Sequence, residues 1–294
     1  KIRSSVTRVW VRVPPPARDK YGINLNYRIY FKRGAIINNN LRILATSDVH
    51  IGAFTDKRSP HPNKCMYAFK IVVDKAIEEK VDLVLIAGDF FDHNRIRKDV
   101  SDYVLDQLAR LPMPTVILPG NHDPLDENSV YWRMDLKGKA PKVHLITTKG
   151  GETVSYPELD VAVWGKPHVS YDDIELYPLK DPPKKGKETW QLGIGHGHFI
   201  RDQGDMGRSY PIEKEEIAQC DRDYVALGHW DAHMNISQSE VVAYYVGSPT
   251  WVGTSSIVEF TMENGGKNVK VEPFPVKVDP PTETTQINNR GATF

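Results

Sequence analysis

The chain has 294 residues, of which 40% are hydrophobic and 26% charged, and its formal net charge is zero. This composition is typical of a globular protein and excludes a largely disordered or collagen-like chain. The two cysteines lie outside any paired motif, which argues against a disulfide framework or a thiolate metal site. No apolar run approaches the roughly 20 residues that span a bilayer, so we expect a cytoplasmic protein without membrane contact.

Residues 1–40 are basic. They carry nine Lys or Arg and a single acidic residue, Asp19, which gives this segment a net charge of +8 and the rest of the chain −8. Because Lys and Arg supply most non-specific affinity for nucleic-acid phosphates, this basic N-terminal extension is a candidate nucleic-acid contact. Alternating apolar and polar side chains over residues 25–31 predict, as the alternative, a half-buried strand with a solvated outer face.

Strands and helices alternate from residue 41 onward. Short apolar runs predict strands, and apolar residues at three- and four-residue steps predict helices at 66–80 and 100–111. The first strands are expected at 41–46, 81–87 and 115–118. Such alternation indicates a parallel sheet. Shorter strands, which could form a second sheet packed on the first, are expected at 142–146, 160–164, 190–194, 224–227, 241–246 and 256–260.

Polar side chains follow these strands where each strand ends. The residues in this position are Asp48, His50, Asp89, Asp92, Asn121, His122, His196 and His229. Because ligands bind at the carboxyl edge of open α/β sheets, we expect one site rather than several. Carboxylate, imidazole and amide oxygen are ligands for divalent first-row metals. Two such ions about 3.5–4 Å apart can clamp both the attacking and the leaving oxygen of a phosphoryl centre.

Five motifs occur in a characteristic order. They are Ser47-Asp48-Val49-His50, Gly88-Asp89-Phe90-Phe91-Asp92, Gly120-Asn121-His122-Asp123, His196-Gly197 and Gly228-His229. Over residues 41–260 this series resembles the calcineurin-like metallophosphoesterase superfamily. The resemblance implies an α/β fold with two packed β-sheets flanked by helices, a four-layer sandwich, in a domain spanning residues 41–270. Residues 271–294 are then expected to be a peripheral tail.

The resemblance also implies a role for each motif residue. The metal ligands would be Asp48, His50, Asp89, Asn121, His196 and His229, for two divalent ions that we expect to be Mn, with Fe, Zn or Mg as alternatives. Asp89 would bridge the two ions. His122 would lie near the scissile phosphate and protonate the leaving oxygen, and Asp123 would orient it. Histidine suits this task because its ordinary pKa lies near neutrality.

Within the superfamily the chain is most similar to the SbcD-type DNA-repair exonuclease branch. The supporting motifs are Ala226-Leu227-Gly228-His229 and Tyr245-Val246-Gly247-Ser248-Pro249. The resemblance implies a nuclease that hydrolyses phosphodiester bonds of DNA through attack by a metal-bound hydroxide. It further implies nucleic acid as substrate and an SMC-like ATPase partner or a homodimer.

Two positions depart from the pattern of that branch. Asp231 stands where the usual last motif has its second histidine, with His233 two residues further on; we favour Asp231 as the ligand because the spacing is kept. Asp92 stands where nuclease members often have a histidine. Alternatives therefore remain: a phosphodiesterase or phosphatase acting on nucleotides or other small phosphoesters, and a phosphoesterase-fold scaffold that binds without catalysis.

Other residues are candidates for substrate contact. Those in loops after the first two motifs are Arg58, His61, Arg95 and Arg97, and arginine is suited to bidentate phosphate contact. His198 lies two residues beyond His196. Trp230 and Trp251 either stack on a base or pack in the core, whereas His144 and His168 are expected to be structural or solvated.

Overall fold

The computed structural model describes residues 30–32, 35–37, 40–53, 63–173, 176–205, 207–263 and 265–278. The chain divides into two units, Lys1–Ile37 and Asn38–Phe294. In the first unit, β1 (Tyr30–Lys32) pairs antiparallel with β2 (Ala35–Ile37). Most of the strand expected at 25–31 lies outside the described residues.

The first sheet of the larger unit has the strand order β16-β15-β3-β4-β5-β6. Its parallel strands are β3 (Leu41–Thr46), β4 (Leu83–Ala87), β5 (Thr115–Leu118) and β6 (Val143–Leu145). The antiparallel strands β15 (Thr254–Glu263) and β16 (Gly266–Pro275) extend it beyond β3. The sheet is therefore mixed: β3, β4, β5 and β6 form its parallel part, and β15 and β16 form an antiparallel edge next to β3.

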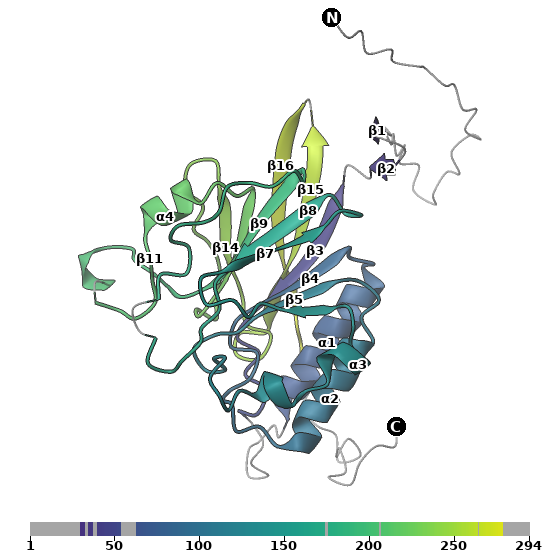
Figure 1. Ribbon diagram of the computed structural model, residues 1–294, viewed down its shortest axis with the longest axis vertical. Coiled ribbons are helices and arrows are strands. Elements are labelled where there is room, and N and C mark those ends of the chain that lie inside the picture. The colour runs from purple at the N-terminus through teal and green to yellow at the C-terminus, as the bar shows by residue number, and fades with distance from the viewer. Residues whose placement is uncertain are drawn as a thin grey trace, which may run out of the picture. The chain divides into compact units, whose positions relative to one another are not determined.

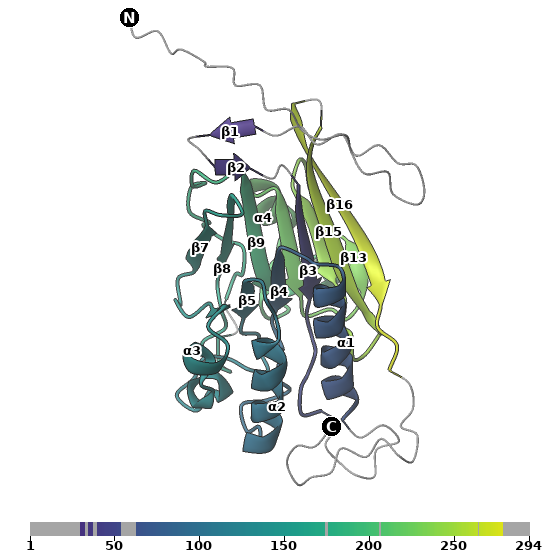
Figure 2. The same cartoon turned by 90° about the vertical axis from the view of Figure 1, so that its right-hand side faces the viewer.

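Helices α1 (Lys64–Glu78), α2 (Lys98–Ala109) and α3 (Leu136–Lys139) accompany this first sheet (Figure 1). The expected helices at 66–80 and 100–111 correspond to α1 and α2. Figure 2 shows that α1 and α2 run side by side. Their buried apolar faces pack on the outward side chains Leu44, Val84 and Ile86 of the strands, which is the packing expected for helices in βαβ crossovers.

The second sheet has the order β13-β14-β12-β9-β8-β7. Its strands are β7 (Glu152–Tyr156), β8 (Val161–Gly165), β9 (Trp190–His196), β12 (Tyr224–Gly228), β13 (His233–Asn235) and β14 (Val242–Val246). Its outer face carries α4 (Lys214–Gln219) and the short parallel pair β10 (His198–Phe199) and β11 (Pro211–Ile212). Two 3₁₀ turns lie at Val130–Arg133 and Gln203–Asp205.

The central core lies between the two sheets. Ile43 and Leu85 from the first sheet meet Leu192, Ile194 and other side chains of the second, all fully buried. Because side chains alternate between the faces of a strand, β3 and β4 are buried on both sides and read as nearly continuous apolar runs. The prediction of an α/β fold with two packed sheets flanked by helices is confirmed.

The C-terminal boundary expected at residue 270 falls inside β16, which continues to Pro275. Phe274 and Val276 are buried in the core between the first sheet and its helices. Residues 271–275 therefore belong to the sheet and Val276 to the core, rather than to a peripheral tail. None of the helices that the structure describes is long and apolar enough to cross a lipid bilayer.

Candidate metal centre

The predicted ligands gather where the central strands of both sheets end. Asp48 and Asp89 follow β3 and β4, and His229 follows β12. His196 is the last residue of β9, where it pairs in register with Gly228 of β12. The two sheets thus direct their carboxyl ends to one place, as expected of ligand sites in α/β folds.

The backbone at the site is strained at four predicted ligands. Asp48, His50, Asp89 and His229 have positive φ angles of 51°, 50°, 48° and 97°. Non-glycine residues rarely adopt this region, and such strain concentrates at functional sites. The cost is offset by backbone hydrogen bonds from the amide of Asp48 to the Gly88 carbonyl (3.1 Å) and from the amide of His50 to the Asp89 carbonyl (3.0 Å).

Two motif glycines leave room for the ligands. A Cβ atom on Gly88, which has φ +86°, would lie 2.1 Å from Nδ1 of His196. A Cβ atom on Gly120 would lie 2.2 Å from Oδ1 of Asp89. Real Cβ contacts do not approach this closely, so any larger residue at either position would displace a proposed ligand.

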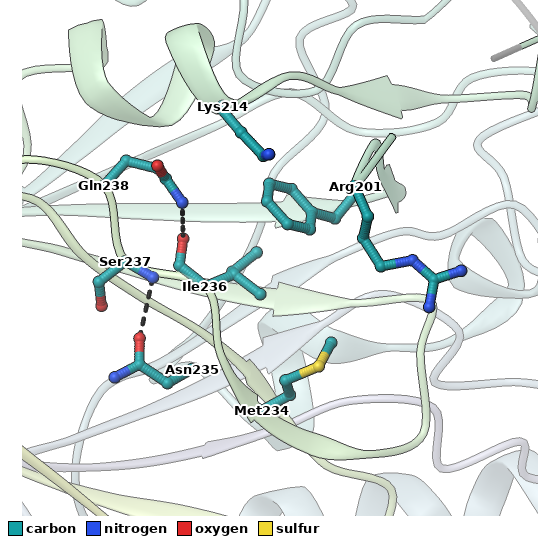
Figure 3. Close-up of a pocket in the computed structure, with 8 residues that line it drawn as sticks. Arg201, Lys214, Met234, Asn235, Ile236, Ser237 and Gln238 are labelled. Carbon is teal, nitrogen blue, oxygen red and sulfur yellow. Dashed lines mark hydrogen bonds between the residues drawn. The ribbon is translucent and has the colours of Figure 1, made fainter. Parts of the chain in front are cut away.

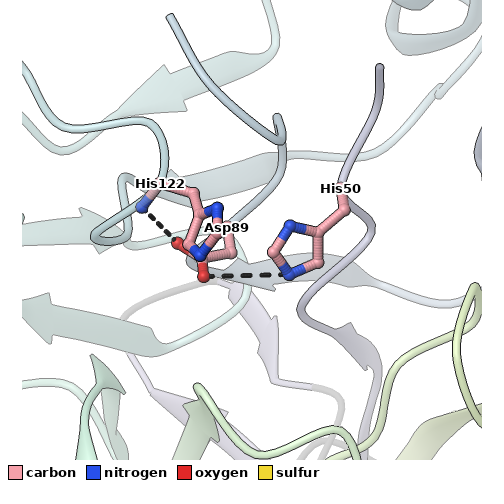
Figure 4. Close-up of side chains that lie close together, drawn as sticks. All are labelled: His50, Asp89 and His122. Carbon is pink, nitrogen blue, oxygen red and sulfur yellow. Dashed lines mark hydrogen bonds and ion pairs between the residues drawn. The ribbon is translucent and has the colours of Figure 1, made fainter. Parts of the chain in front are cut away.

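Asp89 is the central residue of the site. It belongs to both groups of potential metal-binding side chains among the described residues: His50, Asp89 and His122, and Asp48, Asp89 and His196. Its Oδ2 atom lies 3.2 Å from Nε2 of His196 and 3.8 Å from Nε2 of His50. Figure 4 shows the His50 ring directed toward this carboxylate. The position suits a carboxylate shared between two cations.

Two histidines present the same ring nitrogen to Asp89. Nδ1 of His196 lies 2.9 Å from the Ala87 carbonyl, and Nδ1 of His50 lies 3.2 Å from Oδ1 of Asp92. Carbonyl and carboxylate oxygens only accept hydrogen bonds, so Nδ1 donates in both rings and Nε2 carries the lone pair when the ring is neutral. This is the arrangement of metal-binding histidines, whose other nitrogen is held by an oxygen acceptor.

Asn121 and His229 complete the cluster beside His196. Oδ1 of Asn121 lies 3.0 Å from Nε2 of His196 and 3.1 Å from Nδ1 of His229. The amide of His229 donates to both carboxylate oxygens of Asp48, at 3.1 Å each. Donor atoms from both sheets therefore converge on one small volume.

The electrostatics of the cluster favour a bound cation. Burial, together with the nearby Asp89 carboxylate, raises the pKa of Asp48 to about 6. Burial alone would lower the pKa of His196, but Asp89 and Asp48 raise it to about 9. For Asp89, burial alone would raise the pKa. The His196, His122 and His50 imidazoles nevertheless hold the pKa of Asp89 well below its usual range.

These shifts have one physical cause. Two buried carboxylates lie close together, and Nε2 of His196 faces oxygen atoms on two sides. Without metal, a proton on His196 must supply the balancing positive charge, whereas a divalent cation would do so while accepting the lone pair of Nε2. Oxygen and imidazole donors with no sulfur fit Mn, Fe or Zn. The residues present thus fit a metal centre.

His122 lies at the open side of the cluster. Its side chain is 45% exposed, and its ring lies edge-on to that of His50 with centroids 4.7 Å apart. The backbone amide of His122 donates to Oδ1 of Asp89 (2.9 Å), and Nδ1 donates to the Asp92 carbonyl (3.0 Å). Nε2 is therefore the nitrogen available for exchanging a proton with a substrate.

The prediction that Asp123 orients His122 is wrong in its geometry. Asp123 is fully buried, and its carboxylate accepts hydrogen bonds from the amides of Gly120 (2.7 Å) and Phe91 (2.9 Å) and from the Tyr131 hydroxyl (2.6 Å). The side chain closes the turn that carries His122 and makes its bonds there rather than with the imidazole. Asp92 holds the imidazole instead, through its backbone carbonyl.

Neither Asp231 nor His233 belongs to the groups of potential metal-binding side chains among the described residues, so the choice of Asp231 as seventh ligand stays a prediction. Burial raises the pKa of Asp231, and the nearby His50 opposes this shift in part. The Asp231 carbonyl also accepts from the Ser248 amide (2.8 Å). His233 lies in β13, where its ring packs 5.4 Å from that of Tyr244.

The residues predicted to contact substrate differ in their surroundings. Arg58 and His61 lie outside the described residues. Arg95 is exposed, and the Arg97 guanidinium is held by Asp99 at the start of α2. His198 accepts a hydrogen bond from the Trp230 indole at Nδ1 (3.1 Å), and its Nε2 lies 3.6 Å from Asp205. These two contacts anchor His198 within the protein.

The two tryptophans differ in environment. Tyr245 stacks on one side of Trp230, with ring centroids 5.1 Å apart and an interplanar angle of 10°, and the Arg201 guanidinium lies 4.8 Å over the Trp230 ring. Trp230 therefore packs within the protein. Trp251, in contrast, is 46% exposed beside His50.

A pocket of about 290 Å³ lies on the outer side of the second sheet (Figure 3). Its lining residues are Phe199, Arg201, Lys214, Met234, Asn235, Ile236, Ser237 and Gln238. None of them is a predicted metal ligand. The metal centre is thus a separate cluster at the sheet edge and not this pocket.

Three further residues contact the backbone of the ligand-bearing segments. His168 is fully buried and contacts the His196 carbonyl through Nε2 (3.0 Å). Ser248 and Thr250 donate through their hydroxyl groups to the carbonyls of Asp48 (2.7 Å) and Val49 (2.6 Å). Ser248 lies in a motif quoted for the family resemblance, but nothing in the sequence pattern marks Thr250 or His168.

Comparisons with known proteins agree with this fold and site. The sequence profile of the calcineurin-like phosphoesterase family matches residues 41–232. A stretch of 119 residues is 31% identical to the DNA double-strand break repair protein Mre11 of Methanosarcina mazei; it makes up 36% of this chain and 19% of that protein. The chain thus spans about a fifth of the length of this curated relative.

Two solved structures share the fold. The structure of TT1561 of Thermus thermophilus superposes with a TM-score of 0.51 at 12% identity, covering 81% of this chain and 99% of that one. A putative 5'-nucleotidase from Staphylococcus aureus gives a TM-score of 0.52 at 16% identity, covering 82% and 55%. Since the profile covers about two thirds of the residues and the clusters can hold metal ions, the chain belongs to the calcineurin-like phosphoesterase family.

Proposed function

We propose that this protein is a two-metal phosphodiesterase that hydrolyses nucleic acid, of the SbcD-like type. The observation that carries the proposal is the convergence of the Asp89 carboxylate with His50, Asp48 and His196, all of which offer metal-ligating atoms. Family membership supports a hydrolase acting on phosphoesters. The nuclease assignment is the finer step that the experiments below test.

Each residue then has a defined task. When bound, two divalent cations supply the charge that activates water and neutralises the phosphate oxygens. Asp89 would be a ligand to the cations, and the acceptors on Nδ1 of His50 and His196 keep their Nε2 atoms aimed at the centre. His122, anchored through Nδ1, gives the proton on Nε2 to the leaving oxygen.

Two observations support nucleic acid as the substrate. The stretch shared with the archaeal repair protein is 31% identical, and residues 1–40 carry a net charge of +8. A basic segment increases affinity for any polynucleotide because it neutralises phosphates. An SMC-like ATPase partner or a homodimer remains a prediction from the resemblance alone.

The test compares substrates and variants in parallel. Metal-stripped protein should be inactive on bis-(4-nitrophenyl) phosphate and recover with Mn, and the same preparation is assayed on single-stranded DNA, double-stranded DNA, RNA and cyclic nucleotides. We expect Asp89→Asn to lose more than about 10³-fold in kcat, because a shared ligand supports several kcal/mol of charge stabilisation. His122→Asn should lose about 10²–10⁴-fold.

The control for both variants is Asp106→Asn, which changes an exposed carboxylate on α2 and should behave as the unsubstituted protein. Hydrolysis of cyclic or mononucleotides without any cleavage of polynucleotides would favour the small-phosphoester alternative. Tight binding of two metal ions with no hydrolysis of any ester would favour the binding scaffold.

A further inference from the structure

The turn between β14 and β15 is fastened to the loop that carries the first metal ligands. Within this turn, Ser248 and Thr250 donate to the carbonyls of Asp48 and Val49, and the Trp251 amide donates to the Ser248 hydroxyl (3.0 Å). The backbone of Trp251 is therefore positioned by the same loop that positions Asp48 and His50. Any displacement of this turn would also displace the proposed metal centre.

The indole of Trp251 stands at the edge of that centre. Its ring centroid is 6.0 Å from that of His50, and the His50 ring lies 4.7 Å from that of His122. Trp251 is 46% exposed, and the next residue, Val252, is 52% exposed. Solvent therefore reaches a large aromatic surface next to the proposed reacting phosphate, although burying such a surface is favourable.

Trp230, the other tryptophan near the site, has different surroundings. Trp230 precedes Asp231 and is also close to the site, but Tyr245 stacks on its ring and the Arg201 guanidinium lies 4.8 Å over it. Its indole nitrogen is also engaged, by His198. Trp230 is thus engaged within the protein, whereas Trp251 is 46% exposed.

We propose that Trp251 is a specificity-determining residue that stacks on the nucleobase attached to the phosphate at the metal centre. This inference rests on the proposed function and names the part of the substrate that this residue recognises. The base adjoining a phosphate is one sugar away from it. The Trp251 ring lies 6.0 Å from the His50 ring, whose Nε2 atom lies 3.8 Å from Oδ2 of the central carboxylate, Asp89. Stacking accepts any base because every base has a π face.

The proposal distinguishes substrates by chemistry. A neutral indole adds no attraction for the phosphate itself, so esters of aliphatic alcohols gain nothing from Trp251. Stacking on a base contributes about 5- to 150-fold in affinity. The enzyme should therefore bind a nucleotide more tightly than the same sugar phosphate without its base.

The experiment measures binding of AMP and of ribose 5-phosphate to the full-length protein by calorimetry, with Mn and without it. The unsubstituted protein should bind AMP about 5- to 150-fold more tightly than ribose 5-phosphate. Trp251→Leu should remove this preference while leaving the affinity for ribose 5-phosphate unchanged. Trp251→Phe keeps an aromatic ring and should retain part of the preference.

A matched control is Trp132→Leu, because Trp132 is also exposed, at 53%, and no described contact joins its ring to a proposed ligand. This variant should keep the AMP preference. Indole fluorescence gives a second readout that does not depend on the leucine variant folding: AMP should quench emission in the unsubstituted protein, and Trp251→Phe should abolish most of that quenching.

Three results would overturn the inference: equal affinity of the unsubstituted protein for AMP and ribose 5-phosphate, an undiminished AMP preference in Trp251→Leu, or an equal loss for both ligands, which would mean that the substitution damages the metal centre. Failure of the proposed function would give another result, namely no diester hydrolysis by the unsubstituted protein. A base preference that depends on Trp251 would stand even then.

Discussion

Asp92 contacts both imidazoles on which the proposed chemistry depends. Its carboxylate holds Nδ1 of His50 (3.2 Å), and its carbonyl holds Nδ1 of His122 (3.0 Å). The sequence placed Asp92 in the second motif, at a position where histidine is frequent. Its double contact could not be predicted, because it depends on how two loops from neighbouring strands meet.

We expect Asp92→Asn to weaken Mn binding about 10- to 100-fold, because residues that orient a metal-binding histidine have effects of this size. The amide can still accept from His50 but no longer adds negative charge behind the ring. Calorimetric titration of metal-stripped protein with Mn measures the change, with Asp106→Asn as control. An unchanged Mn affinity would show that His50 needs no support from Asp92.

His168 shows the same dependence on the tertiary fold. Burial, followed in size by the nearby His196 charge, lowers the pKa of His168 to about 4. The unfolded chain has a histidine pKa near 6.5, so it binds more protons than the folded protein between these values. The stabilising contribution is therefore present above about pH 6.5 and is lost as the pH falls through about 4.

The resulting prediction is that the metal-free protein loses up to about 3 kcal/mol between pH 6.5 and 4 through this one group. His168→Phe cannot titrate there and should show a shallower decrease over that range, although it is less stable at neutral pH because the His196 carbonyl loses its partner. Urea unfolding at several pH values measures both slopes. Parallel slopes would contradict the assignment.

At the scale of elements, the turn that carries Asn121 and His122 is held by Asp123. The Asp123 carboxylate accepts two backbone amides and the Tyr131 hydroxyl. The sequence predicted Asp123 as a partner of the His122 imidazole, whereas its carboxylate bonds to the turn and to Tyr131. The side chain that bonds to Asp123 is Tyr131. It lies in a 3₁₀ turn that apolar periodicity does not predict.

Tyr131→Phe should lower the free energy of unfolding by about 1.5–3 kcal/mol, because it removes a hydrogen bond to a buried charged acceptor. Tyr103→Phe is the control: its hydroxyl makes a longer bond to the Met66 carbonyl (3.3 Å) in a half-buried position, and the loss should be smaller. Denaturant midpoints at equal m-values give the comparison. Equal losses would mean that the Asp123 network contributes no special stability.

The elements that were predicted and those that were missed differ in burial. The strands β3, β4 and β12 are mostly apolar because layers cover both faces. β7 and β16 are sheet edges with many exposed side chains, so their sequences contain no apolar run. Edge strands owe their conformation to pairing with a neighbour, which local sequence does not encode.

At the scale of the whole molecule, the sequence predicted two sheets and a single site but not the strand order that joins them. The order β13-β14-β12-β9-β8-β7 places β9 and β12 side by side at the centre of the second sheet. This pairing brings His196 and His229 together although β10, β11 and α4 lie between the two strands along the chain. Motif order indicated that these residues act together; only the tertiary pairing supplies the distances.

The basic segment provides the last prediction, because it separates polynucleotide from small-ester specificity. The unit Asn38–Phe294 contains every described ligand, and its first core strand begins at Leu41. We therefore expect deletion of residues 1–37 to preserve turnover of bis-(4-nitrophenyl) phosphate. Affinity for DNA or RNA should fall, and its dependence on salt should flatten by about 0.9 for each phosphate that the protein no longer neutralises. Fluorescence anisotropy at several salt concentrations measures both effects. A folded truncation with unchanged affinity and slope would show that the basic residues do not contact nucleic acid and would shift the preferred substrate toward small phosphoesters.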